Sequence, residues 1–100
     1  MKVAIYSRII EEDQQHELQH LFDELKRQGI EPVIFHPFFE KIRSGFEFSS
    51  DMSAFYDSTD LDESIEFVIS LGGDGTLLDT VSLVRDKNIP VLGINFGRLG

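Results

Sequence analysis

Cysteine is absent from this chain, and cations are scarce. Without cysteine there is no disulfide, no thiol nucleophile and no thiolate-ligated zinc, and the composition fits a reducing cytoplasm, where we expect the protein. Apolar runs of the roughly 20 residues that cross a membrane are also missing, so we expect no membrane partner. The formal charge is -9, from 18 acidic and 9 basic residues. Because a nucleic-acid ligand requires a basic stripe, which this sequence lacks, we expect no nucleic-acid partner.

What the chain does contain is an alternation of apolar runs and amphipathic stretches. Its 100 residues, 41% of them hydrophobic, suffice for one small core and exclude disorder. The pattern predicts strands over 3–6, 32–35, 67–71 and 91–94, helices over 13–28, 36–43 and from 77 to a stop at Asn88 and Pro90, and an exposed acidic connection over 49–64. Strands that alternate with helices predict an α/β fold with a parallel, doubly wound, Rossmann-like sheet and flanking helices.

The two longer predicted helices carry apolar residues at a spacing of three and four, which predicts the face that packs on the sheet. These residues are Leu18, Leu21, Phe22 and Leu25 in the first helix, and Leu77, Leu78, Val81 and Val84 in the second. Asp13 is suited to cap the start of the first helix and Gly29 to end it.

The same helix spells the zincin motif H-E-x-x-H, with histidines at positions 16 and 20. A zinc site requires both imidazoles on one face of the helix, inside a cleft, together with a third ligand. At about 100° per residue, His16 and His20 fall opposite the apolar face. We therefore expect both histidines to be exposed, and we assign no metal-ligating residue from the sequence.

The loop Gly72-Gly73-Asp74-Gly75-Thr76 lies between an apolar strand and a helix, a position at which open α/β sheets bind ligands. Its glycines let the backbone approach a ligand closely, and the start of the next helix offers unpaired N–H groups and a partial positive charge. We therefore predict that this loop handles nucleotide phosphates without any lysine. It is not a P-loop, which requires Gly-Lys-Ser or Gly-Lys-Thr, and Leu78 replaces the third glycine of a dinucleotide fingerprint.

Asp74 requires an explanation, because a carboxylate beside a phosphate is repelled by it. It could hold Mg²⁺, or it could accept the proton of a hydroxyl that attacks phosphorus, and both roles belong to phosphoryl transfer. A third role is structural, since aspartate commonly caps the helix that follows it.

Two segments resemble one enzyme family. Residues 71–78, Leu-Gly-Gly-Asp-Gly-Thr-Leu-Leu, look like the GGDGT motif of NAD kinases, which diacylglycerol and sphingosine kinases share and phosphofructokinases carry in a related form. Residues 90–100, Pro-Val-Leu-Gly-Ile-Asn-Phe-Gly-Arg-Leu-Gly, are similar to the glycine-rich segment that follows in NAD kinases and that lipid kinases lack in this form. The two motifs in this order resemble the NAD kinase family and imply a phosphofructokinase-like nucleotide-binding sheet.

The resemblance implies phosphorylation of the adenosine-ribose 2′-hydroxyl of NAD to give NADP. ATP, or polyphosphate in some members, is the implied donor, and Mg²⁺ or another divalent cation is the implied cofactor. Asp74 matches the aspartate that accepts the proton and contacts the dinucleotide. The full set of implied binding residues is Gly72, Gly73, Asp74, Gly75, Thr76 and Asn95. Asp79 departs from the pattern, since some relatives carry a basic residue there.

The resemblance also implies that residues 1–100 are an N-terminal α/β nucleotide-binding domain. Family members are close to three times as long, and they add an Asn-Asp or Asn-Glu substrate motif and a β-rich C-terminal domain that this chain lacks. We therefore predict that this chain by itself does not turn over NAD. Homodimers or homotetramers are the assemblies implied for the full-length protein.

Two other functions share parts of this pattern. A lipid kinase of the diacylglycerol type carries the first motif but not the second, and a charge of -9 is repelled by anionic lipid. A non-catalytic nucleotide-binding module would keep the loop without its chemistry. The substitution Asp74→Asn separates this last function from the first, because it abolishes turnover only in an enzyme.

Overall fold

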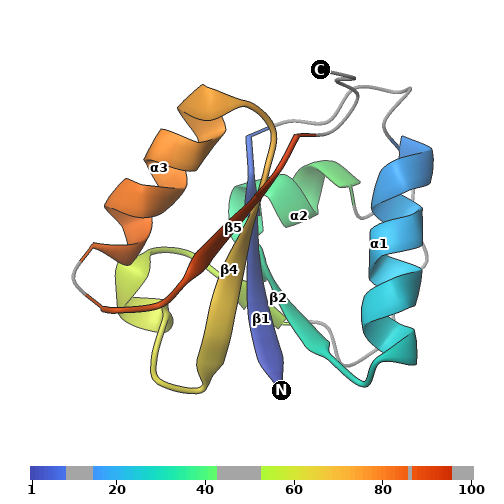
Figure 1. Cartoon of the computed structure of the whole chain (residues 1–100), viewed down its shortest axis with the longest axis horizontal. Coiled ribbons are helices and arrows are strands. Elements are labelled where there is room, and N and C mark those ends of the chain that lie inside the picture. Colours follow the sequence, from blue (N-terminus) through green and yellow to red (C-terminus); the bar gives the residue numbers. More distant parts are fainter. Residues whose placement is uncertain (9–14, 43–52, 86, 96–100) are drawn as a thin grey trace.

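A computed structural model describes residues 1–8, 15–42, 53–85 and 87–95 of this chain. The elements, in chain order, are β1 (Lys2–Ser7), α1 (Gln15–Arg27), β2 (Glu31–Phe35), α2 (His36–Ile42), β3 (Ser53–Phe55), the short 3₁₀ helix η2 (Ser58–Asp60), β4 (Ile65–Leu71), α3 (Asp74–Val84) and β5 (Val91–Ile94). Their arrangement in space is shown in Figure 1.

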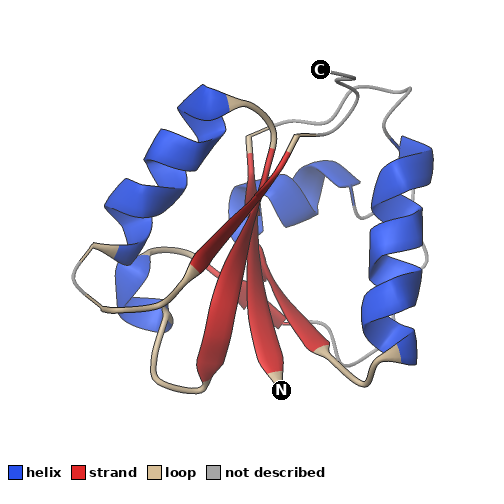
Figure 2. Cartoon of the chain, viewed as in Figure 1, coloured by secondary structure: helices blue, strands red, loops and turns tan. Residues whose placement is uncertain are grey.

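The five strands form one parallel sheet in the order β3-β2-β1-β4-β5. From β1 the chain proceeds outward to β2 and β3, and it then returns to place β4 and β5 on the other side of β1. Helices α1 and α2 cover one face of the sheet and α3 the other (Figure 2). The doubly wound α/β fold predicted from the sequence is therefore confirmed.

Alternation along the strands divides the core between the two faces. Val3 and Ile5 of β1 belong to the cluster that contains α1 and α2, whereas Ala4 belongs to the cluster that reaches Val84 of α3. All three strand residues are fully buried, as expected for a central parallel strand.

The predicted face of α1 is confirmed. Leu18, Phe22 and Leu25 are buried against the sheet, and the partly buried Leu21 packs beside them. Both histidines of the zincin-like motif are exposed, as expected from the helical geometry. Gly29 follows the helix with a positive φ of 73°, which favours glycine at this stop. The proposed cap at Asp13 and the stop at Gly45 lie outside the described residues.

The prediction of an irregular connection over 49–64 is wrong in part. Ser53–Phe55 forms β3, which pairs in parallel with β2, and Phe55 is fully buried. A three-residue strand is too short to show a period, and the serines and acids around it concealed its one large apolar side chain. The acids of this stretch that the structure describes are exposed as predicted, and Asp57 caps η2 by accepting a hydrogen bond from the Thr59 N–H.

The predicted face of α3 is wrong in part, because Val84 is buried as predicted but Leu77, Leu78 and Val81 are exposed. Its buried residues are Thr76, Thr80 and Val84, whereas Leu78 is 69% exposed and Val81 53% exposed. The two threonines are small enough to bring the helix backbone close to the sheet, and the Thr80 hydroxyl is satisfied by donating to the Thr76 carbonyl at 2.8 Å. Close packing therefore outweighed the apolar periodicity of the leucines. The helix also ends earlier than predicted, at Val84.

Candidate functional site

Three strands end at the same level and bring distant parts of the chain together. Ser7 of β1 pairs with Leu71 of β4, which in turn pairs with Ile94 of β5. The Gly72 N–H extends this ladder by donating to the Ile94 carbonyl at 2.9 Å. The next residues, Arg8, Gly72 and Asn95, consequently lie along one edge of the sheet, where the carboxyl ends of β1, β4 and β5 meet.

This edge contains the point at which the winding of the sheet reverses, between β1 and β4. Parallel sheets of this kind bind ligands in the crevice outside the carboxyl ends of the strands at that point. The fold therefore places the predicted glycine loop, and Asn95 beside it, where a nucleotide is expected to bind.

Gly72 is required by the chain itself. Its φ is +141°, a region that L side chains rarely adopt, and a Cβ there would lie 2.6 Å from the Thr76 hydroxyl oxygen. Thr76 is only 8% exposed, so it packs beneath the loop and has little room to move. The turn out of β4 thus depends on a glycine at this position.

Gly73 has no such structural requirement. Its φ is −96°, and a Cβ built there would meet no atom within 4 Å. Gly73 is also the N-cap of α3, and its carbonyl accepts from the Leu77 N–H at 3.1 Å. The space at Gly73 is therefore open next to the first helical turn, whose N–H groups have no partner within the helix.

The capping role considered for Asp74 is wrong. The N-cap is Gly73, which makes no side-chain cap, and Asp74 is already the first helical residue. Its side chain is exposed, and in the described part of the chain its carboxylate makes no hydrogen bond. An acid in the first turn is compatible with the helix dipole, but this carboxylate is left available to a ligand.

Sequence reasoning missed a cation at this edge, Arg8. Its Nε donates to Asp79 Oδ2 at 2.5 Å and its Nη2 donates to Oδ1 at 3.0 Å, so the two side chains form a bidentate pair between β1 and α3. The Tyr6 hydroxyl donates to the same carboxylate at 3.0 Å. A basic residue directly after the first strand was a usable signal, because that is where parallel sheets place ligand contacts.

The network shifts the pKa values of its members. Hydrogen bonding to Arg8 lowers the pKa of Asp79, and burial, followed by the hydrogen bond to Asp79, raises the pKa of Tyr6. The pKa of Arg8 is raised by the same pairing. Asp79, where some relatives carry a base, is therefore an ionised partner of a guanidinium.

Comparison with known proteins gives the same family as the two motifs. The family model described as "ATP-NAD kinase N-terminal domain" matches residues 7–100, which include the loop, Arg8 and Asn95. This chain belongs to the NAD kinase family.

Curated NAD kinases match over the full length of the chain. The NAD kinase of Flavobacterium psychrophilum is 37% identical over 100 residues, that of Flavobacterium johnsoniae 35% over 100 residues, and that of Cytophaga hutchinsonii 36% over 101 residues. Each match covers 100% of this chain and 34% of the relative. The chain thus spans about a third of the length of the NAD kinases that it matches.

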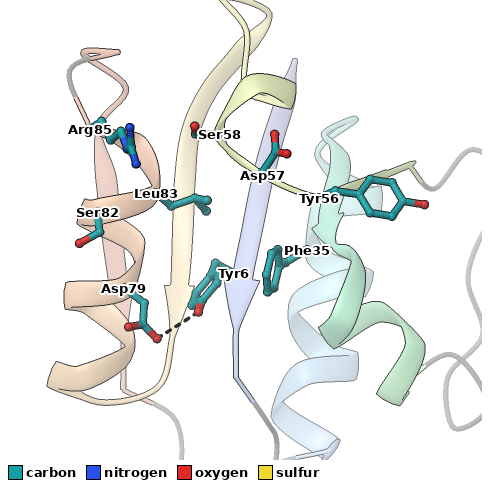
Figure 3. A pocket seen from close by; sticks show the side chains of 9 residues that line it. All are labelled: Tyr6, Phe35, Tyr56, Asp57, Ser58, Asp79, Ser82, Leu83 and Arg85. Atoms are coloured by element: carbon teal, nitrogen blue, oxygen red, sulfur yellow. Dashed lines mark hydrogen bonds between the residues drawn. The ribbon is translucent and has the colours of Figure 1, made fainter.

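An open pocket of about 450 Å³ lies next to the site on the α3 face (Figure 3). Tyr6 and Phe35 form its floor, with ring centroids 4.7 Å apart, and Asp79 borders it through the hydrogen bond from Tyr6. None of residues 72–76 lines this pocket, so the glycine loop and the pocket are separate. They are connected by Asp79 and Tyr6, which line the pocket and belong to the hydrogen-bond network of Arg8.

Two features of the described residues bear on possible ligands and partners. No three His, Cys, Asp or Glu side chains among them gather where they could hold a metal ion. No helix in the described ranges has the length and apolar character that crossing a membrane requires.

Proposed function

We propose that the full-length protein transfers the γ-phosphoryl group of ATP to the adenosine-ribose 2′-hydroxyl of NAD, giving NADP and ADP. The observation that carries this proposal is the exposed, unpaired Asp74 carboxylate on the first turn of α3, beside an open glycine loop, in a chain of the NAD kinase family. A carboxylate in that position has a use in phosphoryl transfer that a simple phosphate-binding loop does not require.

The loop and the helix start hold the substrate phosphates. Gly73 leaves room for a phosphate to approach the backbone, and the first-turn N–H groups of α3 supply donors and a partial positive charge. Thr76 supports the turn from below, and Gly75 contacts the dinucleotide next to Asp74. Asn95, exposed at the end of β5, adds a polar side chain on the far side of Gly72.

Asp74 accepts the proton. As the 2′-oxygen of the ribose forms its bond to the γ-phosphorus, the O–H bond breaks and the proton passes to the carboxylate. The bond from phosphorus to the β,γ-bridging oxygen breaks, and ADP leaves with that electron pair. We propose that a divalent cation such as Mg²⁺ would arrive with the nucleotide, where it would supply positive charge to the ATP phosphates.

The remaining parts of the site come from outside these 100 residues. Because the chain spans 34% of its relatives, we propose that it is the N-terminal nucleotide-binding domain and that a β-rich C-terminal domain completes the NAD pocket. The isolated chain is then inactive, and the complete protein works in the cytoplasm as a homodimer or homotetramer. A lipid kinase is not favoured, since the family model and the curated relatives are NAD kinases.

The test is NADP formation by the full-length protein with NAD, ATP and Mg²⁺, in parallel with the 100-residue chain. We expect the full-length protein to form NADP and the 100-residue chain to form none. NADP is identified by a dehydrogenase that requires the 2′-phosphate. A parallel reaction with diacylglycerol vesicles as acceptor serves as the control. Phosphorylation of the lipid and not of NAD would overturn the proposal, and turnover by the 100-residue chain would contradict its incompleteness.

A further inference from the structure

Arg8 reaches across to the start of α3, although more than half of its side chain stays exposed to solvent. It follows Ser7, the residue of β1 that pairs with Leu71, so its backbone stands level with Gly72. Its Nη2 reaches the Gly75 carbonyl at 3.4 Å, and its Nη1 would be 3.2 Å from a Cβ at Gly75. The φ of Gly75 is not positive, so the close guanidinium, rather than the backbone, is what favours glycine there.

The guanidinium of Arg8 is held through Nε and Nη2, whereas Nη1 is left open. The Asp79 carboxylate accepts from Nε and Nη2, and the Tyr6 hydroxyl donates to Oδ2, the same oxygen that accepts from Nε. Among the described residues Nη1 has no hydrogen-bond partner, and the Arg8 side chain is 56% exposed. An arginine fixed in this way keeps the two N–H groups of Nη1 as charged donors for a phosphate oxygen.

Charge explains why a cation is required here. Residues 72–84 contain two acids, Asp74 and Asp79, and no lysine or arginine. A phosphate that approaches the loop therefore meets two carboxylates on α3 in a chain of formal charge -9. Pairing with Arg8 neutralises Asp79 and places positive charge on the loop side of that pair.

We propose that Arg8 is a phosphate-binding residue of this site, with Nη1 donating to a non-bridging phosphate oxygen of the nucleotide on the glycine loop. The proposal rests on the proposed function only in taking that ligand to be NAD or ATP. Both nucleotides present non-bridging phosphate oxygens, on the diphosphate of NAD and on the triphosphate of ATP. Asp79 and Tyr6 act as positioning residues, because they orient the guanidinium without touching the ligand.

A purely structural role makes a different prediction. If Arg8 served only to tie β1 to α3, removing either partner of the pair would have the same effect, namely a lower melting temperature with unchanged affinity. Phosphate binding predicts a difference between the partners. Loss of Arg8 removes a donor, whereas loss of the Asp79 charge keeps the donor and removes a repelling carboxylate.

The experiment measures the Kd of the full-length protein for NAD and for ATP by calorimetric titration, together with its melting temperature and NADP formation. The variants are Arg8→Gln, Arg8→Lys and Asp79→Asn. Arg27→Gln is the matched control, because Arg27 forms an equivalent pair with Glu24 at the end of α1.

We expect Arg8→Gln to raise the Kd for one of the two nucleotides about tenfold or more, the usual effect of losing a hydrogen bond to a charged group. The nucleotide affected identifies which phosphates Arg8 contacts. Arg8→Lys should recover part of the affinity, and Asp79→Asn should bind within about threefold of the natural protein or more tightly. Arg27→Gln should leave both Kd values unchanged.

The outcomes separate this inference from the proposed function. If the natural protein forms NADP and Arg8→Gln changes neither Kd, the inference fails while the function stands. If no NADP forms but Arg8→Gln raises the Kd for NAD or for ATP, the proposed function fails while the inference stands. Equal melting and binding effects in Arg8→Gln and Asp79→Asn, or no binding of either nucleotide by the natural protein, would overturn the inference.

Discussion

The same added methyl group should lower the stability of the protein at one glycine of the loop and its nucleotide affinity at the next. In Gly72→Ala the new Cβ lies 2.6 Å from the Thr76 hydroxyl oxygen, at a φ of +141°. Backbone strain of about 1–3 kcal/mol adds to a similar cost for overpacking against a buried side chain. We expect the free energy of unfolding to fall by about 2–6 kcal/mol.

Gly73→Ala should fold with the stability of the natural protein but bind nucleotides more weakly. The new Cβ meets nothing within 4 Å, and φ is −96°. The reduced entropy of the unfolded chain, about 0.4–1 kcal/mol, roughly offsets the poorer N-cap that alanine makes. The methyl group instead occupies the space through which a phosphate approaches the backbone, so nucleotide affinity should fall about tenfold or more, an estimate based on losing a charged hydrogen bond.

The assay for both variants is calorimetric melting of the full-length protein without ligand, followed by titration with NAD and with ATP. Melting of Gly72→Ala at the temperature of the natural protein would refute the structural reasoning. Unchanged affinity of Gly73→Ala for both nucleotides would refute the assignment of this loop as the phosphate site.

Two further predictions concern stability. The Ser70 hydroxyl is buried and, among the described residues, without a hydrogen-bond partner, whereas the Ser7 hydroxyl donates to the Leu71 carbonyl at 3.0 Å. In denaturant titrations we expect Ser70→Ala to leave the free energy of unfolding unchanged or to raise it by about 1 kcal/mol, and Ser7→Ala to lower it by about 1–2 kcal/mol. The reverse order would contradict this reasoning. Because Arg8 lowers the pKa of folded Asp79 below its ordinary 3.8, the stability that their pair contributes is full above that value and is lost as the pH falls through the lower, folded pKa. The melting temperatures of the natural protein and Asp79→Asn should therefore differ at pH 6, begin to converge below about pH 3.8 and become equal below the folded pKa of Asp79. A gap that widens in acid would show the sign to be wrong.

The fold and the loop were predictable because their signals are local. Continuous apolar runs mark the central strands, and three glycines around Asp74 mark a ligand-facing turn within five residues of sequence. Even the exposure of His16 and His20 followed from helical geometry alone. Each of these predictions used residues that act on their immediate neighbours.

The parts that were not predictable depend on contacts made across the sheet. The buried face of α3 is set by how closely Thr76 and Thr80 let the helix approach β1 and β4, and no period in the helix sequence encodes that distance. Arg8 gains its role from Asp79, which lies 71 positions away along the chain. The short strand around Phe55 is identified only by its pairing with β2.

The central claim is that Asp74 accepts a proton in a nucleotide site formed by this loop. The measurement that tests it most directly is the rate of NADP formation by the full-length Asp74→Asn variant, with its Kd for NAD measured on the same preparation. The account predicts a rate at least about 100-fold lower, with the Kd within about threefold, because asparagine keeps the shape and hydrogen bonding but cannot take the proton. A rate within about twofold of the natural protein would contradict the account and remove Asp74 from the chemistry.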